Sequence, residues 1–428
     1  MSGAALLRAA SLGLSVWLGT TAAAGAQGAP IERITFEEAV QRAVAGNPAV
    51  EQAAAGIVRA EALLQQTRAL SLPSLAATLT TTTIGPVPEF SGQSIVPRTQ
   101  LNAGAAVTVP LFAPVRWAER VQAGDQVGVA RRGVEDVRRQ VAVATAQAYL
   151  AVIAARRLVE LNERARDNAM AHYAFADERF KGGLGSRLNA LRARQELSSD
   201  EARVEEARLG VRRAQEALGV LAAADGPLDA AGEPTFDTSG DAAGDRAAVA
   251  GRPDLRLVAA REAAAERVVS HSWREYLPEA TALVAPQLLT PTGLFAQGRS
   301  WSASMQFAVP LFDAGQRSGR AAERRGLLQL ARAERSDLER RAVSEVRTAR
   351  EAVAATERAL ARARAAAEQA NEVLEITDVA FREGATTNIE VLDAQRRARD
   401  AETDAAIAED ALRRARLDLL VALGRVPG

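Results

Sequence analysis

Cysteine is absent from the 428 residues, and the chain has only two histidines. Without cysteine there is no disulfide, no thiolate nucleophile and no cysteine-ligated metal site. His172 and His271 stand alone on stretches with helical composition, so Ser-His-Asp catalysis and multi-histidine metal sites are hard to build. We expect both to be solvated helix residues. The sequence therefore predicts no enzyme, no metal site and no cofactor.

Net charge is also absent, because 53 basic residues balance 53 acidic ones. Binding to nucleic acid needs basic residues in excess on one face, so we expect no nucleic-acid partner. A long apolar run is missing too. Beyond the N-terminus we find no uninterrupted stretch of the roughly 20 apolar residues that a transmembrane helix needs. If the chain crosses a membrane, it should do so with β-strands.

Residues 1–26 have the pattern of a secretory signal peptide. Arg8 precedes a short apolar stretch, and Ala24-Gly25-Ala26 offers a cleavage site that would make Gln27 the first mature residue. An uncleaved N-terminal anchor is the alternative interpretation. Because no cysteine follows the site, we expect an exported protein without a lipid anchor.

The rest of the chain is a tandem duplication. The matched motifs keep their order at offsets near 200 to 205 residues. They are Asn47-Pro48 with Arg252-Pro253, Leu72-Pro73 with Leu277-Pro278, Val109-Pro110-Leu111-Phe112 with Val309-Pro310-Leu311-Phe312, Phe180-Lys181-Gly182-Gly183 with Phe381-Arg382-Glu383-Gly384, and Leu218-Gly219 with Leu423-Gly424. We predict a first repeat over 27–223, a linker or loosely packed insert over 224–251, and a second repeat over 252–428.

Each repeat should contain one long helix and two shorter ones. No proline occurs between Pro114 and Pro227 or between Pro310 and Pro427, so both blocks are permitted to be helical. Apolar residues spaced by three and four, or by seven, predict coiled-coil seams. Glycine-containing turns at 181–186 and 383–387 should separate a long helix from a shorter return helix. The return helix and the helix before the strands would together match the long one.

A different period lies between the prolines of each repeat. Apolar and small or polar residues alternate over 101–109 and 300–309, with partner strands at 75–84 and 280–289. This length and alternation are typical of membrane-spanning strands, although a half-buried sheet packed on helices is the alternative. Four strands are too few for a closed membrane barrel. Three copies would supply 12 strands and 12 helical columns around one axis.

The sequence resembles the TolC-like outer membrane efflux proteins. The resemblance rests on Ile34-Thr35-Phe36-Glu37-Glu38-Ala39 before Asn47-Pro48, on Val-Pro-Leu-Phe after each second strand, and on the Phe-x-x-Gly turn followed by Ile389-Glu390-Val391-Leu392-Asp393-Ala394-Gln395. It implies an α+β membrane protein, with a long antiparallel coiled-coil α-barrel and a transmembrane β-barrel. It also implies a homotrimer in the outer membrane lipid of a Gram-negative bacterium, extending into the periplasm.

The same resemblance implies partners and cargo. The partners would be a periplasmic adaptor and an inner-membrane pump of the RND or ABC type, as in tripartite efflux or type I secretion. The cargo would be drugs, metal ions or polypeptides. In the family the helical tips meet the adaptor, which transfers here to Gly182, Gly183 and Leu184 in the first tip and to Gly384 and Ala385 in the second.

Glu390 and Asp393 are three residues apart and share one helical face. Threefold symmetry would turn them into two carboxylate rings that favour cations, and the family places an acidic entrance filter at the matching positions. A solvated acidic pair at a helix start is the alternative. Where the best-known family member has an Asp and an Arg that latch its entrance, this chain has Asn189 and Thr386, so an identical latch is not expected.

Two other classes of protein remain as alternatives to a passive conduit. A periplasmic adaptor should show one helical hairpin with compact β-domains, whereas this chain shows two matched repeats. A coiled-coil scaffold would stay soluble after export. The residues themselves do not choose between cargoes.

Overall fold

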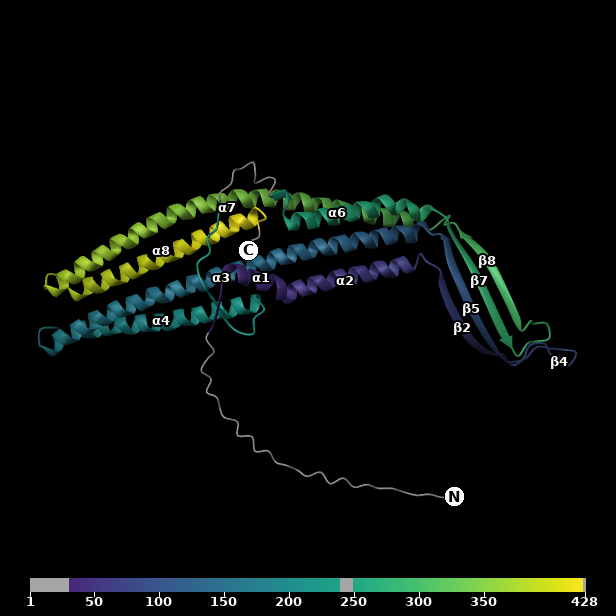
Figure 1. Cartoon of the computed structure of the whole chain (residues 1–428), viewed down its shortest axis with the longest axis horizontal. Helices are drawn as coiled ribbons and strands as arrows, with labels where there is room; N and C mark the ends of the chain where they lie inside the picture. Colours follow the sequence, from purple (N-terminus) through teal and green to yellow (C-terminus); the bar gives the residue numbers. More distant parts are fainter. Residues whose placement is uncertain (1–30, 239–248, 426–428) are drawn as a thin grey trace, which may run out of the picture.

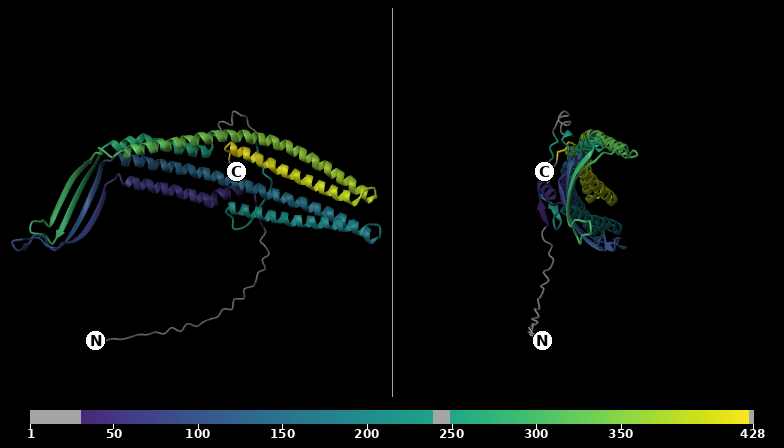
Figure 2. Two further views of the ribbon diagram at one scale, coloured as in Figure 1. Left: turned by 180° about the vertical axis from the view of Figure 1, so that it is seen from behind. Right: turned by 90° about the vertical axis from the view of Figure 1, so that its right-hand side faces the viewer.

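The computed structural model describes residues 31–238 and 249–425. The predicted signal peptide over 1–26 lies outside the described residues. The described chain is elongated, with a β-sheet at one end and two helical hairpins whose tips lie at the other (Figures 1 and 2). The two shorter return helices of the hairpins end near the middle of this length (Figure 1).

Helices form the larger part of the described chain. They are α1 (Phe36–Gly46), α2 (Pro48–Ala69), α3 (Pro114–Lys181), α4 (Arg187–Leu221), α6 (Pro253–His271), the 3-10 helix η1 (Ser272–Tyr276), α7 (Gln316–Arg382) and α8 (Asn388–Ala422). Near the sheet the helices lie in the order α2, α3, α6, α7, and near the tips in the order α4, α3, α8, α7. The predicted end-to-end arrangement is therefore confirmed: α2 and α4 flank α3, while α6 and α8 flank α7.

The boundaries of the helices follow from local chemistry. Proline stands at the first position of α2, α3 and α6, where its missing N–H costs no helical hydrogen bond. We did not predict the break between α1 and α2. Asn47 is extended there, and its side-chain oxygen accepts a hydrogen bond from the N–H of Ala49 at 2.9 Å.

The strands are β1 (Glu32–Ile34), β2 (Ser74–Thr83), β3 (Glu89–Phe90), β4 (Gln93–Ser94), β5 (Thr99–Phe112), β6 (Leu228–Ala230), β7 (Glu279–Thr290) and β8 (Arg299–Ala308). The main sheet is antiparallel in the order β2-β5-β7-β8, so one hairpin from each repeat forms half of it. Among the described residues, β2 and β8 have no further strand beside them.

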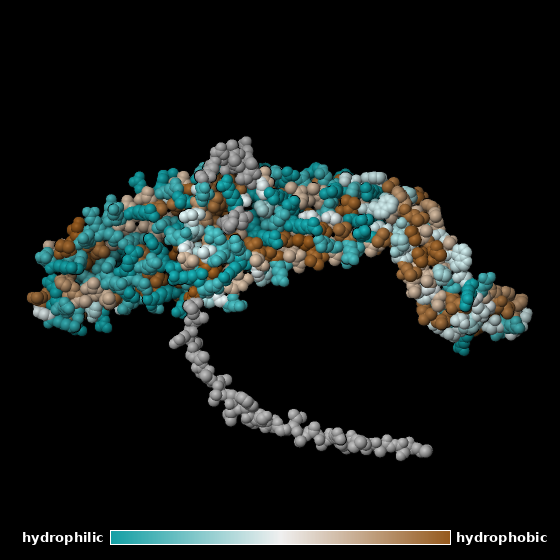
Figure 3. Space-filling model, viewed as in Figure 1, coloured by the Kyte–Doolittle hydropathy of each residue, from teal (hydrophilic) through white to brown (hydrophobic). Residues whose placement is uncertain are grey.

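The register of the sheet places apolar residues in rows across all four strands. Leu75 pairs with Val107, Val107 with Val284, and Val284 with Ala303. Several large apolar side chains of the edge strands are exposed, among them Leu79 and Trp301 at 71% and 75%. Hydrophobic residues gather over the strands, whereas the helices toward the tips are mostly hydrophilic on the same face (Figure 3).

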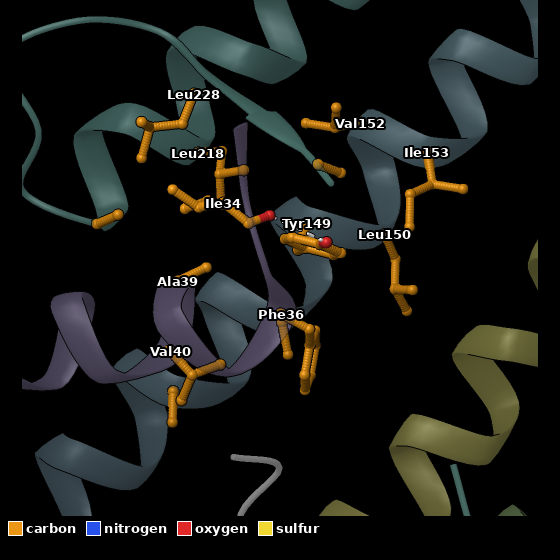
Figure 4. Close-up of a cluster of buried hydrophobic side chains, with 14 of the residues drawn as sticks. Ile34, Phe36, Ala39, Val40, Tyr149, Leu150, Val152, Ile153, Leu218 and Leu228 are labelled. Carbon is orange, nitrogen blue, oxygen red and sulfur yellow. Dashed lines mark hydrogen bonds between the residues drawn. The ribbon is translucent and has the colours of Figure 1, made fainter. Parts of the chain in front are cut away.

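A buried core lies near the middle of the molecule. Ile34, Phe36, Tyr149, Leu218 and Leu228 belong to it (Figure 4). The hydroxyl of Tyr149 donates to the carbonyl oxygen of Gly232 at 2.9 Å, and the carbonyl oxygen of Ile34 lies 3.2 Å from the same hydroxyl. Because β1 and β6 pair in parallel here, residues 32–34 and 228–230 are held together on α3.

Part of our linker prediction is therefore wrong. Residues 228–230 form the buried strand β6, and its central residue Asp229 forms ion pairs with Arg33 and Arg156. A three-residue strand is too short to show a period, which is why composition alone indicated a loose insert. Residues 239–248 of the predicted linker lie outside the described part of the chain.

One helix, α3, is long and apolar enough by composition to cross a membrane, with a mean hydropathy of 1.3 over its best 18 residues. The window is not an uninterrupted apolar run, because Arg139 and Arg156 bound the uncharged stretch of α3, so it does not contradict our prediction. Residues 141–155 of α3 contain no charged side chain. They supply Ala146, Tyr149 and Leu150 to the mid-chain core, so packing within the protein accounts for their apolar character.

Candidate functional site at the helical tips

The two helical hairpins turn at equivalent positions. Gly183 and Gly384 have φ values of +76° and +78°, a left-handed conformation that glycine adopts without steric cost. The N–H of Leu184 donates to the carbonyl of Arg179 at 2.9 Å, and that of Ala385 to Ala380 at 2.7 Å. These bonds close the long helices, so the chain can reverse in both repeats as predicted.

The predicted adaptor-contact residues all lie at these turns. Gly182, Gly183, Leu184, Gly384 and Ala385 are exposed, and Leu184 leaves 77% of its surface accessible. The two turns lie side by side at one end of the molecule (Figures 1 and 2). The described residues cover only a small part of the Leu184 side chain, which leaves it available for contact with another protein.

Glu390 and Asp393 are both exposed at the start of α8. The Glu390 carboxylate accepts a hydrogen bond from the N–H of Thr387 at 3.4 Å, so it stabilises the start of the helix. Asp393 forms an ion pair with Arg397 at 2.9 Å, one turn further along. Each carboxylate thus has a local role, and the arginine offsets part of the negative charge of Asp393.

His172 is buried, so our expectation of a solvated histidine is wrong at this position. Its side chain lies on α3 and is only 5% exposed, because the first turn of α8 packs over it. Its Nε2 lies 2.8 Å from Oδ1 of Asn388, and its ring lies 5.4 Å from that of Phe381. Burial lowers the pKa of His172, with the Asn388 hydrogen bond opposing it. A lone histidine on a helix carries no signal of this partner.

A buried cluster of charges joins the two hairpins further from the tips. Glu196 and Asp200 on α4 are each only 4% exposed. Arg399 on α8 contacts both, at 3.3 and 2.9 Å, and Nε of Arg396 donates to Glu196 at 2.9 Å. Burial raises the pKa of Asp200 against the opposing charge of Arg399. The arginines outweigh burial at Glu196, so the pKa of that carboxyl is lowered.

Sequence reasoning missed this cluster. Glu196 and Arg396 are 200 residues apart, whereas the turns repeat at an offset of 201 residues, as Gly183 and Gly384 show, so the ion pair does not join equivalent positions of the two repeats. Mixed Arg and Glu residues along a coiled-coil helix can form either a solvated face or an interhelical one. At this position the interhelical interpretation is correct.

A groove opens between the two tips, which we call the inter-tip groove. Its volume is about 400 Å³. It is lined by Ala176, Arg179, Leu184, Gly185, Ser186, Asn189, Arg192, Phe381, Gly384, Thr386, Thr387, Asn388 and Ile389. Asn189 and Thr386, which stand where the resemblance places an Asp and an Arg, both face this groove. Among the described residues, no ion pair spans this groove.

The described residues show no metal-binding arrangement. Over 31–238 and 249–425, no three side chains of histidine, aspartate or glutamate are grouped so that they could hold an ion. Glu390 and Asp393 carry their charge in helix capping and in an ion pair. What the tip can offer chemically is therefore hydrogen-bond donors, exposed apolar surface and fixed charge.

Comparison with known proteins gives the family. The profile of the outer membrane efflux protein family matches residues 39–224 and 246–425. A membrane protein of Pseudomonas aeruginosa is 22% identical with a TM-score of 0.80, covering 92% of this chain and 91% of its own. The Campylobacter jejuni CmeC outer membrane channel is 16% identical with a TM-score of 0.78, over 99% and 94% of the two chains.

The open state of the Neisseria gonorrhoeae MtrE outer membrane channel is similar as well, at 19% identity and a TM-score of 0.76, over 91% and 88% of the two chains. No curated protein sequence matches the chain. At these identities the solved structures establish the fold, while the profile spans both repeats. The chain belongs to the outer membrane efflux protein family, and its fold is that of the α+β channel-tunnels of the bacterial outer membrane.

Proposed function

We propose that this outer membrane efflux channel works as a homotrimeric, passive conduit. The observation that carries the proposal is the four-stranded sheet, whose edges β2 and β8 have no neighbouring strand in the described chain. Open edges are not tolerated in lipid, and closed membrane barrels begin at about eight strands. Three copies supply 12 strands, with β8 of one copy beside β2 of the next, and leave no edge.

The conduit would carry its cargo from a periplasmic adaptor and an inner-membrane pump to the exterior. The exposed turns containing Leu184 and Gly384 support the adaptor contact, because they end the helical part opposite to the sheet (Figure 1). Energy would come from the pump, of the RND or ABC type. Drugs, metal ions and polypeptides remain the candidate cargoes.

Glu390 and Asp393 are proposed as the entrance filter. Both are exposed at the tip of α8, and a threefold axis would repeat them as two rings of negative charge that favour cations. Their roles in helix capping and in the Arg397 ion pair mean that replacement by alanine would disturb structure as well as charge. Amide variants separate the two effects, since glutamine can still cap a helix.

The test is ion selectivity in planar lipid bilayers. Purified wild-type protein should give discrete, cation-selective conductance steps. Glu390→Gln/Asp393→Asn should keep the conductance and lose most of the selectivity. Asp167→Asn, an exposed change on α3 at a residue paired with Arg166, serves as the matched control and should leave selectivity unchanged. Equal selectivity in the double variant would move the filter elsewhere, and a soluble monomer without conductance would end the proposal.

A further inference from the structure

The inter-tip groove has an unusual charge balance. Two half-buried arginines line it, Arg179 and Arg192, and no acidic residue does. Within the described residues, neither arginine forms an ion pair, although Arg179 lies over the ring of Phe175 at 5.8 Å. Along the helices, by contrast, arginines such as Arg382 and Arg397 at the same end are paired with a carboxylate one turn away.

A buried donor without an acceptor lies in the same groove. Asn388 is 3% exposed, and its Oδ1 is taken by His172. Its Nδ2 is buried and has no hydrogen-bond partner. An unsatisfied buried donor costs about 1–3 kcal/mol, so a ligand group that accepts this hydrogen bond would relieve that cost.

The start of α4 adds to this set of donors. The helix has 35 residues, Ser186 caps it, and no acidic side chain lies in its first turn. A helix N-terminus of this kind favours a negative group. The start of α8 differs, because Glu390 already binds the Thr387 N–H. The helix N-terminus in the groove whose positive partial charge is not offset by an acidic side chain is therefore that of α4, the helix that carries Arg192.

We propose that the inter-tip groove binds a carboxylate, presented by an acidic side chain of the periplasmic partner. The carboxylate would accept hydrogen bonds from Nδ2 of Asn388 on the second hairpin and from the guanidinium groups of Arg179 and Arg192 on the first. One ligand thus bridges both hairpins, at the place where Asn189 and Thr386 leave this chain without an internal pair. The identity of the source rests on the proposed adaptor contact, whereas the chemistry of the groove does not.

Site-resolved arginine labelling tests the groove directly. The full chain, purified in detergent, is treated with phenylglyoxal at constant ionic strength, and the modification of each arginine is followed by peptide mass spectrometry. Added acetate should slow the labelling of Arg179 and Arg192 by roughly fivefold once the site is filled, as expected for charge-assisted hydrogen bonds. Arg187, exposed at the same tip but outside the groove, is the control and should label at an unchanged rate.

The same labelling experiment with two blocked tripeptides, and separately with inorganic phosphate, identifies the chemistry of the ligand. Acetyl-Ala-Glu-Ala-amide should protect as acetate does, and acetyl-Ala-Gln-Ala-amide should not. Protection by inorganic phosphate alone would make the groove a site for free phosphate and overturn the proposal. Equal protection of Arg187, or none at all, would overturn it as well.

A variant gives a second, independent measurement. Asn388→Asp places a carboxylate inside the groove, so Arg179 and Arg192 should label slowly without any added anion, and acetate should protect no further. Labelling of this variant at the wild-type rate would contradict the proposal. Since the experiment needs neither adaptor nor membrane, its failure would leave the conductance test of the channel untouched, and a failed conductance test would not alter the labelling result.

Discussion

Asn47 and Arg252 make the same contact in the two repeats. Each precedes the proline that starts a short helix, and each donates a side-chain hydrogen bond to the carbonyl of the last residue of a return helix. Nδ2 of Asn47 reaches Leu221 at 2.9 Å, and a guanidinium nitrogen of Arg252 reaches Ala422 at 3.2 Å. These bonds join the ends of α4 and α2, and of α8 and α6, into continuous columns.

The two joints should differ in their sensitivity to mutation. Asn47→Asp keeps the oxygen that caps α2 but loses the donor to Leu221, so we expect a loss of about 1 kcal/mol in the free energy of unfolding. Arg252→Ala should cost more, about 3 kcal/mol, because it removes a buried arginine that binds Asp254 and Glu345 and leaves Asp254 with Arg139 at 3.5 Å. Denaturant unfolding of the purified variants measures both.

Arg132→Ala is the matched control for the second joint. Arg132 forms an exposed ion pair with Glu135 on one helix face, and removing such a pair costs at most about 1 kcal/mol. If Arg252→Ala were no worse than this control, Arg252 would not be what holds α8 to α6.

The contact between His172 and Asn388 should depend on pH. Burial lowers the pKa of His172 from its ordinary value of 6.5, so the unfolded chain takes up a proton before the folded one does. The stability that His172 contributes is complete above that value and is lost as the pH falls toward the lower pKa of the folded state. Asp378, whose charge raises the pKa of His172, opposes the effect.

Hydrogen exchange of the first turns of α8 measures this loosening. As the pH falls from about 7.5 to about 5.5, the amides of these turns should lose protection against exchange relative to the amides of the mid-chain core. His172→Gln can still bind Asn388 but does not titrate, so its exchange should show no such extra change with pH. A wild-type profile equal to that of His172→Gln would refute the role of this histidine.

The charge cluster between α4 and α8 should behave as one unit. Arg399→Ala leaves Glu196 and Asp200 buried together and should destabilise the protein by about 3 kcal/mol. Asp200→Ala/Arg399→Ala should cost less than the sum of the two single changes, since the variants share one interaction. Arg397→Ala, on the same helix and 76% exposed, should cost at most about 1 kcal/mol. Additive single effects in the thermodynamic cycle would show that the residues are not coupled.

Two glycines of α4 should respond to alanine with opposite signs. A Cβ at Gly219 would overlap the carbonyl oxygen of Gly226, whereas one at Gly210 would meet nothing within 4 Å. Gly210→Ala should therefore stabilise the protein by about 0.5–1 kcal/mol through helix propensity. Gly219→Ala should destabilise it, because the backbone at 226 must move. Thermal unfolding of both variants checks the sign, and stabilisation by both would contradict the close approach.

Much of the fold follows from periodicity. Strand ends such as Thr83 and Ala308 lie within one residue of prediction, because alternation over ten residues and flanking prolines are strong signals. The pairing of β1 with β6 could not be predicted, since it joins residues almost 200 positions apart through three-residue strands. The break at Asn47 was missed because a helix of the same total length satisfies the same period.

The candidate site, like the fold, could be predicted from the sequence only in part. The turns at Gly183 and Gly384 could be placed from sequence, because glycine reports a local backbone requirement. The burial of His172 and the Glu196–Arg399 contact depend on how α8 packs against α3 and α4, and a single helix carries no signal of its neighbour. Packing between distant segments is thus what the sequence leaves open.

The most direct test of the central claim is the number of copies in the assembled channel. Native mass spectrometry of the protein extracted from the outer membrane measures it without any assumption about cargo or partner. We predict a single species of three chains, because three four-stranded sheets close a 12-stranded barrel without free edges. A monomer, a dimer or any other number of copies would contradict the account.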